Sequence, residues 1–182
     1  MRLNPEKKRI YFTELYNQDF NYVYSFILAR TAGNSQLTED IVQDTFASAW
    51  ISLHRFDQKS SSRTWFCSIA KNKLREYYRR TIYREKFELP GDDGLAEYAD
   101  SFNLEKVAFD NETRRCVIEV LSEINPLYRY ALIMKYMDGL SVKEIAKVLG
   151  RSTKAVDGVL QRAKISFEKA YLKMEGCDGK HE

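Results

Sequence analysis

The sequence predicts an all-α protein made of two small helical domains, and three observations lead to this prediction. Apolar residues recur at helical spacing almost throughout the chain, and no segment shows the sustained alternation of a strand. Capping residues and glycines lie at the ends of these periodic segments. An acidic, glycine-containing stretch separates an N-terminal helical bundle from a C-terminal group of four helices. We expect domains at residues 10–84 and 113–174, a flexible linker at 85–112 and a tail at 175–182.

Three helices are expected in the N-terminal domain. The first covers about residues 11–32 and ends at Gly33, where the chain can turn in a left-handed conformation. The second covers residues 38–54, with the hydroxyl of Thr38 as its cap. A serine-rich loop precedes the third helix, at about residues 62–83. The residues expected to face the core are Phe20, Val23, Tyr24, Ile27, Val42, Phe46, Ala49, Leu53, Phe66, Ile69, Ala70, Leu74 and Tyr77.

The most informative motif is a helix-turn-helix over residues 141–164. Ser141 and Glu144 match the Ser-x-x-Glu capping box that begins a helix. Gly150 lies where that helix must end in a left-handed turn, and Ser152 can then cap a second helix with apolar positions at helical spacing. In such a motif the second helix enters the major groove of DNA, whereas a plain pair of packed helices is the alternative.

The charges of the chain fall in blocks. Six basic residues and one acid lie at 71–84, nine acids and two lysines lie at 85–112, and the last third is basic again. Two basic surfaces joined by an acidic connector favour nucleic acid as a ligand over the alternative of solvated helix faces. The acidic block contains proline and glycine, so we expect a solvated linker with a possible short helix near 102–109. Supporting helices are expected at about 114–124 and 127–137.

Composition and motifs argue against several classes of protein. No apolar run approaches the roughly 20 residues that a membrane-spanning helix needs, and the charged N-terminal segment lacks the apolar core of a secretory signal. Cys67, Cys116 and Cys177 are too widely spaced for a zinc site or a disulfide framework. Glycine-rich phosphate loops and Ser/His/Asp arrangements are absent. We therefore expect a cytoplasmic protein that is not an enzyme and has no cofactor, no metal site, no small-molecule substrate and no membrane insertion.

Three blocks, in this order, resemble the extracytoplasmic-function (ECF) sigma factors of bacterial RNA polymerase. Residues 37–57 (LTEDIVQDTFASAWISLHRFD) resemble the segment of that family that docks on the clamp of core polymerase. Residues 60–80 (SSSRTWFCSIAKNKLREYYRR) resemble its promoter-melting and −10-reading segment. Residues 121–150 (LSEINPLYRYALIMKYMDGLSVKEIAKVLG), followed by AVDGVLQRAK, resemble its −35-reading domain. The positions of the second block that match the family's core motif are Thr64, Trp65, Ile69, Ala70 and Asn72.

The resemblance implies an alternative sigma factor that binds core RNA polymerase, recognises the −35 and −10 promoter elements and promotes DNA melting. It also implies an anti-sigma factor as regulator, and a linker that lies in the positively charged RNA channel of polymerase, where a plain solvated tether is the alternative. An ordinary helix-turn-helix transcriptional regulator explains residues 141–164 equally well but leaves residues 37–80 unexplained. Oligomeric state separates the two, because such a regulator dimerises on a palindrome whereas a sigma factor acts as a monomer.

The surface expected to bind core polymerase is one face of the second helix. Asp40, Gln43, Asp44 and Ala47 recur at the spacing of a single helical face, opposite the apolar residues. An acidic, amide-bearing stripe suits docking on a basic coiled coil, and an ordinary solvated face is the alternative.

By resemblance, the loop after the second helix holds a flipped base of the −10 element, and the third helix follows the melted strand. Hydroxyls and amides can hydrogen-bond a splayed base, while basic side chains meet phosphates. Trp65 could stack on a base, although an aromatic residue near a helix start is more often structural. The residues assigned to −10 DNA are Gln58, Lys59, Ser60, Ser61, Arg63, Trp65, Lys71, Asn72, Arg75, Arg79 and Arg80.

The base-reading positions that the resemblance implies for the −35 element lie on the second helix of the helix-turn-helix. The family usually has a basic residue at the position of Asp157 and a serine at that of Gly158. An aspartate can accept a hydrogen bond from a cytosine amino group, and Gln161 suits adenine, so we expect an unusual −35 preference. The residues assigned to −35 DNA are Arg151, Ser152, Thr153, Lys154, Asp157, Gly158, Gln161, Arg162 and Lys164.

Overall fold

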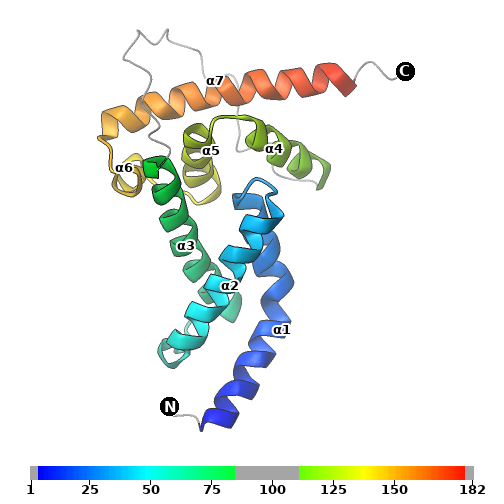
Figure 1. Cartoon of the computed structure of the whole chain (residues 1–182), viewed down its shortest axis with the longest axis vertical. Helices are drawn as coiled ribbons and strands as arrows, with labels where there is room; N and C mark the ends of the chain where they lie inside the picture. Colours follow the sequence, from blue (N-terminus) through cyan, green and yellow to red (C-terminus); the bar gives the residue numbers. More distant parts are fainter. Residues whose placement is uncertain (1–3, 85–110, 179–182) are drawn as a thin grey trace. The chain divides into compact units, whose positions relative to one another are not determined.

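The computed structural model describes residues 4–84 and 111–178, and all regular elements in these ranges are helical (Figure 1). The predicted linker, with its possible short helix near 102–109, lies almost entirely outside the described residues. The chain divides into two compact units, residues 1–76 and 77–182, and the boundary falls inside the third helix. The all-α prediction is therefore confirmed.

The first two helices of the first unit begin at asparagine caps. The side chain of Asn4 accepts a hydrogen bond from the amide of Glu6 (3.2 Å), and Pro5 follows at the first helical position. The first helix therefore begins six residues before the predicted start at residue 11. The elements of this part of the chain are α1 (Pro5–Arg30), α2 (Ser35–Ser52), a 3-10 turn (Leu53–Arg55) and α3 (Ser62–Arg84).

The prediction that Thr38 caps the second helix is wrong. The cap of α2 is Asn34, whose side chain accepts from the amide of Leu37 (2.9 Å). Thr38 lies inside the helix and is fully buried; its hydroxyl donates to the carbonyl of Asn34 (2.7 Å) and lies 2.7 Å from the hydroxyl of Thr31. A buried hydroxyl needs such partners, and they fix the turn between α1 and α2.

The core of the first unit is built around Phe46. Its ring lies 4.7 Å from that of Tyr16 on α1 and 5.0 Å from that of Phe66 on α3, so one side chain joins all three helices. Predicted core residues confirmed as buried are Val23, Ile27, Val42, Phe46, Ala49, Leu53, Phe66, Ala70 and Leu74. The predicted core residues that remain partly exposed are Phe20, Tyr24, Ile69 and Tyr77.

In the second unit, a short π-helical turn interrupts the helix predicted at 127–137. The amide of Asp138 donates to the carbonyl of Ile133 (3.0 Å), a five-residue spacing, before Gly139 turns with a φ of +70°. The side chain of Arg129 donates to the carbonyls of Leu121 (2.5 Å) and Ser122 (2.6 Å) and so closes the end of α4. The elements are α4 (Asn111–Glu123), α5 (Pro126–Leu132), the π turn (Ile133–Met137), α6 (Val142–Leu149) and α7 (Thr153–Asp178).

Candidate DNA-binding and protein-binding surfaces

The predicted helix-turn-helix is formed by α6 and α7. The amide of Ser141 donates to the carboxylate of Glu144 (2.8 Å), and the hydroxyl of Ser141 accepts from the amide of Glu144 (3.3 Å), which completes the capping box. Gly150 ends α6 at a φ of +62° and a ψ of +37°. The hydroxyl of Ser152 then accepts from the amide of Ala155 (3.2 Å). The helix-turn-helix prediction is confirmed at each of these positions.

The outer face of α7 carries a stripe of exposed polar side chains. Lys154, Asp157 and Gln161 are exposed at spacings of three and four residues. Arg151 and Ser152 in the preceding turn and Thr153 at the start of α7 are exposed as well. The opposite face packs into the core of the second unit. Its buried residues are Val156, Val159, Leu160, Ala163 and Phe167. The apolar face thus fixes which side chains α7 offers to solvent.

Arg162 and Lys164 lie at the two edges of this stripe, roughly 80° to either side of Lys154 around the helix. Arg162 leans back along the helix, with Nη2 3.3 Å from the place that a β-carbon on Gly158 would occupy. Its Nε is buried and has no hydrogen-bond partner among the described residues. Lys164 instead extends over the ring of Tyr136, with Nζ 6.0 Å from the ring centroid.

The loop between α2 and α3 is held by local polar contacts. Lys59 forms an ion pair with Asp57 (3.0 Å) and donates its amide to the same carboxylate (3.2 Å), and these contacts lower the pKa of Asp57. Gln58 adopts a positive φ of 60°, and its amide donates to the hydroxyl of Tyr11 (2.8 Å). Ser61 caps α3 by accepting from the amide of Thr64 (3.2 Å). Ser60, Ser61 and Lys59 are therefore exposed on a loop whose two ends are held by hydrogen bonds.

Trp65 takes part in an aromatic contact with the loop. Its ring stacks on that of Phe56 at 4.7 Å and an interplanar angle of 24°. It also lies 5.1 Å from the ring of Phe66, which is fully buried. These contacts fit the structural interpretation of Trp65, because its ring links the end of the loop to the core.

A buried carboxylate that sequence reasoning missed positions the start of α3. Asp19 is only 1% exposed, and it accepts from the hydroxyl of Ser62 (2.5 Å) and from Nε of Arg63 (3.3 Å). The guanidinium of Arg63 also lies 4.3 Å from the centroid of the Tyr22 ring. The available signal was the place of Asp19 in the apolar register of α1, with Val23 and Ile27, where a carboxylate must have a buried partner.

Beyond its first turn, α3 carries polar and basic side chains along its outer side. Asn72, Arg79 and Arg80 are exposed, and Lys71 is partly exposed. Arg75 is partly buried, and its Nε has no hydrogen-bond partner among the described residues. The structure therefore places most of the residues predicted for −10 DNA on the surface, on one loop and one helix.

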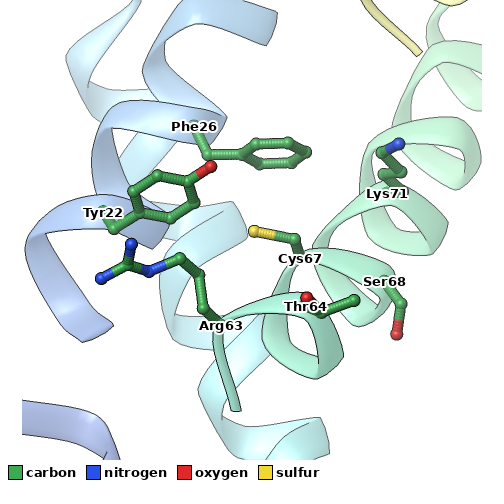
Figure 2. A pocket seen from close by; sticks show the side chains of 7 residues that line it. All are labelled: Tyr22, Phe26, Arg63, Thr64, Cys67, Ser68 and Lys71. Carbon is green, nitrogen blue, oxygen red and sulfur yellow. The ribbon is translucent and has the colours of Figure 1, made fainter. Parts of the chain in front are cut away.

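A pocket of about 290 Å³ opens between α1 and α3 within the first unit (Figure 2). Tyr22 and Phe26 line it from α1, and Figure 2 shows the sulfur of Cys67 directed toward these two rings. Burial raises the pKa of the Cys67 thiol, although the nearby positive charges of Arg30 and Lys71 act to lower it. The remaining lining residues are Arg63, Thr64, Ser68 and Lys71. Arg63 and Lys71, both predicted to bind −10 DNA, thus also border a concave surface.

The four residues predicted to bind polymerase lie on the outer face of α2. Asp40, Gln43, Asp44 and Ala47 are all exposed, while Ile41, Val42, Thr45, Phe46 and Ala49 face the core. The exposed face continues to Ile51, which is 71% exposed although it is apolar. An acidic stripe that ends in an exposed apolar side chain has the composition of a protein-binding surface.

The described residues include neither a cluster of metal ligands nor a membrane-spanning helix. No group of three or more histidine, cysteine, aspartate or glutamate side chains in that part of the chain could hold a metal ion. No helix within residues 4–84 or 111–178 combines the length and apolar character needed to cross a membrane.

Comparison with known proteins gives matches over both units. Residues 15–81 match the model of sigma-70 region 2, and residues 114–166 match that of sigma-70 region 4. CnrH, a sigma factor of Cupriavidus metallidurans, is 34% identical over 69% of this chain and 69% of its own. The ECF sigma factor SigM of Bacillus subtilis is 29% identical over 87% of this chain and 93% of its own. A solved complex of the sigma factor RpoE with the anti-sigma factor NepR from Bartonella quintana matches 87% of this chain and 95% of that one, with 19% identity and a TM-score of 0.46.

A region 2 followed by a region 4 defines a transcription initiation factor of the sigma-70 class. Within this class, the chain belongs to the ECF sigma factors of bacterial RNA polymerase. It is an alternative sigma factor, which binds core RNA polymerase and promoter DNA to initiate transcription. An ordinary helix-turn-helix regulator is not favoured, because that class leaves the region 2 match unexplained.

Proposed function

We propose that the exposed stripe of α7 reads the −35 element of the promoter. The observation that supports this proposal is the orientation of α7: its apolar residues are buried, so Lys154, Asp157 and Gln161 must face outward after the turn at Gly150. In a helix-turn-helix this face enters the major groove, where donors and acceptors distinguish the base pairs. Asp157 adds an acceptor for cytosine and lowers the attraction to phosphates.

The loop before α3 and the outer side of that helix would bind the melted −10 strand. The serines at positions 60 and 61 supply hydroxyls for an unpaired base, and the positive φ of Gln58 bends the loop. Flipping a base costs a few kcal/mol of unstacking, so a loop that is already ordered offsets part of this cost. Asn72, Arg79 and Arg80 would then follow the backbone of the strand, since basic side chains bind phosphates.

The outer face of α2 would dock on core polymerase through Asp40, Gln43, Asp44 and Ala47. Exposed acidic residues steer association toward a basic partner and fix the register of the contact. The functional domains would then correspond to residues 10–84 and 113–174, joined by an acidic linker at 85–112 that passes through the RNA channel of polymerase. The linker's charge, nine acids against two lysines, supports this route.

The remaining proposals concern the setting in which the factor acts. We propose that the chain catalyses no reaction itself, works in the cytoplasm where polymerase is, and is held inactive by an anti-sigma factor. Relatives that are sigma factors support the first two. The sequence resemblance supports the third, and the solved RpoE complex provides an example of such a partner.

The experiment that tests the assignment is transcription by purified core polymerase on a pool of randomised templates, with and without the protein. We expect start sites that appear only with the protein, preceded by a −35 and a −10 sequence at fixed spacing. A triple variant, K154A/D157A/Q161A, should lose the enriched −35 sequence and retain binding to core. If this variant still enriches the same −35 sequence, the stripe does not read the −35 element. Binding to duplex DNA without new start sites would instead support an ordinary helix-turn-helix regulator.

A further inference from the structure

We propose that Tyr11 is a positioning residue for −10 recognition, because its hydroxyl holds the loop before α3 through the side chain of Gln58. This inference rests on the proposed binding of an unpaired base by that loop, residues 56–61. The amide of Gln58 donates to the hydroxyl of Tyr11 over 2.8 Å, although the two residues are 47 positions apart in the chain. The sequence assigned Gln58 to DNA, whereas in the structure its amide is bonded to α1.

The backbone of Gln58 explains why this hydrogen bond matters. The φ of Gln58 is +60°, in the left-handed region that few residues other than glycine, asparagine and aspartate adopt. A residue in such a conformation keeps it only where the surrounding structure holds it there. The ion pair between Lys59 and Asp57 is internal to the loop. The hydrogen bond to Tyr11, by contrast, ties the loop to a helix at the residue whose backbone turns it.

Aromatic contacts in turn fix the first turns of α1, which carry Tyr11. The ring of Phe12 lies 5.3 Å from that of Trp50 on α2 and 6.2 Å from that of Phe66 on α3. Phe66 is fully buried, so these contacts join the start of α1 to the core of the first unit. Residues 5–14 of α1 lie before the residues that match sigma-70 region 2. The support for the loop therefore comes from a segment that precedes the matched region.

Asp19 holds the other end of the loop. It accepts hydrogen bonds from the hydroxyl of Ser62, the first residue of α3, and from Nε of Arg63 at 3.3 Å. Two side chains of α1 thus fix the loop near its start and at its end. A loop that already has its binding conformation loses less conformational entropy when the strand arrives. If only a fraction of the loops keeps that conformation, the apparent Kd rises by the reciprocal of this fraction.

The test measures how holoenzyme, the full chain with core polymerase, binds the single non-template strand selected in the transcription experiment. Further strands each carry one abasic site in the −10 element. Tyr11→Phe removes the hydroxyl and keeps the ring. We expect it to weaken binding of the intact strand about 2- to 10-fold, the range for one hydrogen bond. This loss should vanish for the strand that lacks the loop base and persist for the other abasic strands, whereas a merely structural role would weaken all strands equally.

A double-mutant cycle separates the two roles that Gln58 could have. If Tyr11 acts through Gln58, the variant Tyr11→Phe/Gln58→Ala should bind the intact strand no more weakly than Gln58→Ala alone. Additive losses would show that the two side chains act independently, and they would overturn the inference. The matched control is Tyr16→Phe on the same helix. The Tyr16 ring packs on Phe46 in the core, so this variant should bind every strand as the wild type does.

The remaining outcomes distinguish this inference from the proposed function. A Tyr11→Phe holoenzyme that binds the intact strand like the wild type, or that loses affinity equally for all strands, overturns the role of Tyr11 alone. The variant Ser60→Ala/Ser61→Ala tests the loop itself. If that variant binds every strand as tightly as the wild type, the loop binds no base, and the function proposed for the loop fails together with this inference.

Discussion

The guanidinium of Arg162 lies against Gly158 on the outer side of α7, with Nη2 3.3 Å from where a β-carbon would stand. The position of Arg162 around the helix would otherwise place it at the edge of the stripe that we propose to face DNA. Because residue 158 has no side chain, the guanidinium can lie over that position of the helix, and an arginine that faces DNA can bond to the O6 and N7 atoms of guanine. Gly158 therefore sets the place of the Arg162 guanidinium.

Replacement of Gly158 by serine should change the −35 preference at one base pair. The new β-carbon requires the guanidinium to move by a few tenths of an ångström or more, and the hydroxyl brings a new donor. We expect discrimination at that base pair to change by about 1–3 kcal/mol, measured by selection from randomised −35 duplexes with holoenzyme. Gly158→Ala is the control for the hydroxyl: it should displace Arg162 without adding a contact. An unchanged preference in both variants would contradict the role of Gly158.

Asp157→Ala should remove a preference for cytosine and raise non-specific affinity. The exposed carboxylate repels phosphates, so its loss makes the binding of any duplex tighter, most clearly at low salt. Each lost base contact costs about 1–3 kcal/mol of specificity. Competition between the selected −35 duplex and a scrambled one gives both quantities. Promoter choice that stays the same in this variant would show that Asp157 does not read a base.

Asp19→Ala should destabilise the first unit, because it leaves the hydroxyl of Ser62 without its carboxylate acceptor. A lost partner of this kind costs about 1–3 kcal/mol, and the half-exposed Arg63 adds little because water screens it. Urea unfolding of the full chain measures the loss. Asp19→Asn, which keeps an acceptor, should lose less. Glu14→Ala, an exposed acid on the same helix, should stay within about 0.5 kcal/mol. Equal stability of the Asp19 and Glu14 variants would contradict the assignment.

Features that depend on neighbouring residues in the chain were predictable from the sequence. The capping box of Ser141 and Glu144 and the turn at Gly150 are local, and the structure has them as expected. The same rules predicted Thr38 as the cap of the second helix, but the cap is Asn34; residue type alone does not make the choice between them, because both are good caps. Burial of Thr38 against Thr31 decided that choice, and this contact depends on how α1 and α2 pack.

Long-range contacts account for what the sequence did not predict at the candidate site. Asp19 and Ser62 are 43 residues apart, so no local pattern pairs them. The pocket likewise needs side chains from α1 and α3, and only their packing brings Tyr22 near Arg63. The π turn at the end of α5 differs from an α-helical turn by one residue in its hydrogen-bond spacing, which apolar periodicity does not resolve.

Charge reversal on the outer face of α2 should weaken binding to core polymerase. Asp44→Lys replaces an attraction by a repulsion, and exposed pairs are worth about 0.2–1 kcal/mol each, so we expect affinity to fall about 2- to 30-fold. The loss should shrink as salt rises, because exposed charges are screened. Fluorescence titration of labelled protein with core measures it. Glu14→Lys on α1 changes the net charge equally and should bind normally; equal losses would indicate a non-specific charge effect.

The pH dependence of Cys67 reactivity tests the environment of the pocket in the free protein. Burial raises the pKa of this thiol because it disfavours the thiolate, while the charges of Arg30 and Lys71 act in the opposite direction. Since the thiolate is the reactive form, we expect the curve of alkylation rate against pH to lie at higher pH than that of a short peptide with the same sequence. Lys71→Gln removes one lowering charge, so it should move the curve further up. The pKa of this thiol is higher in the folded protein than in the unfolded chain, so the unfolded chain loses the proton at lower pH. The protonated thiol therefore favours the folded state, and this contribution to stability is lost as pH rises from the unfolded pKa through the folded one. A curve that coincides with that of the peptide would show that the thiol is solvated, and the pocket would then lack the partly desolvated wall seen beside Tyr22 and Phe26.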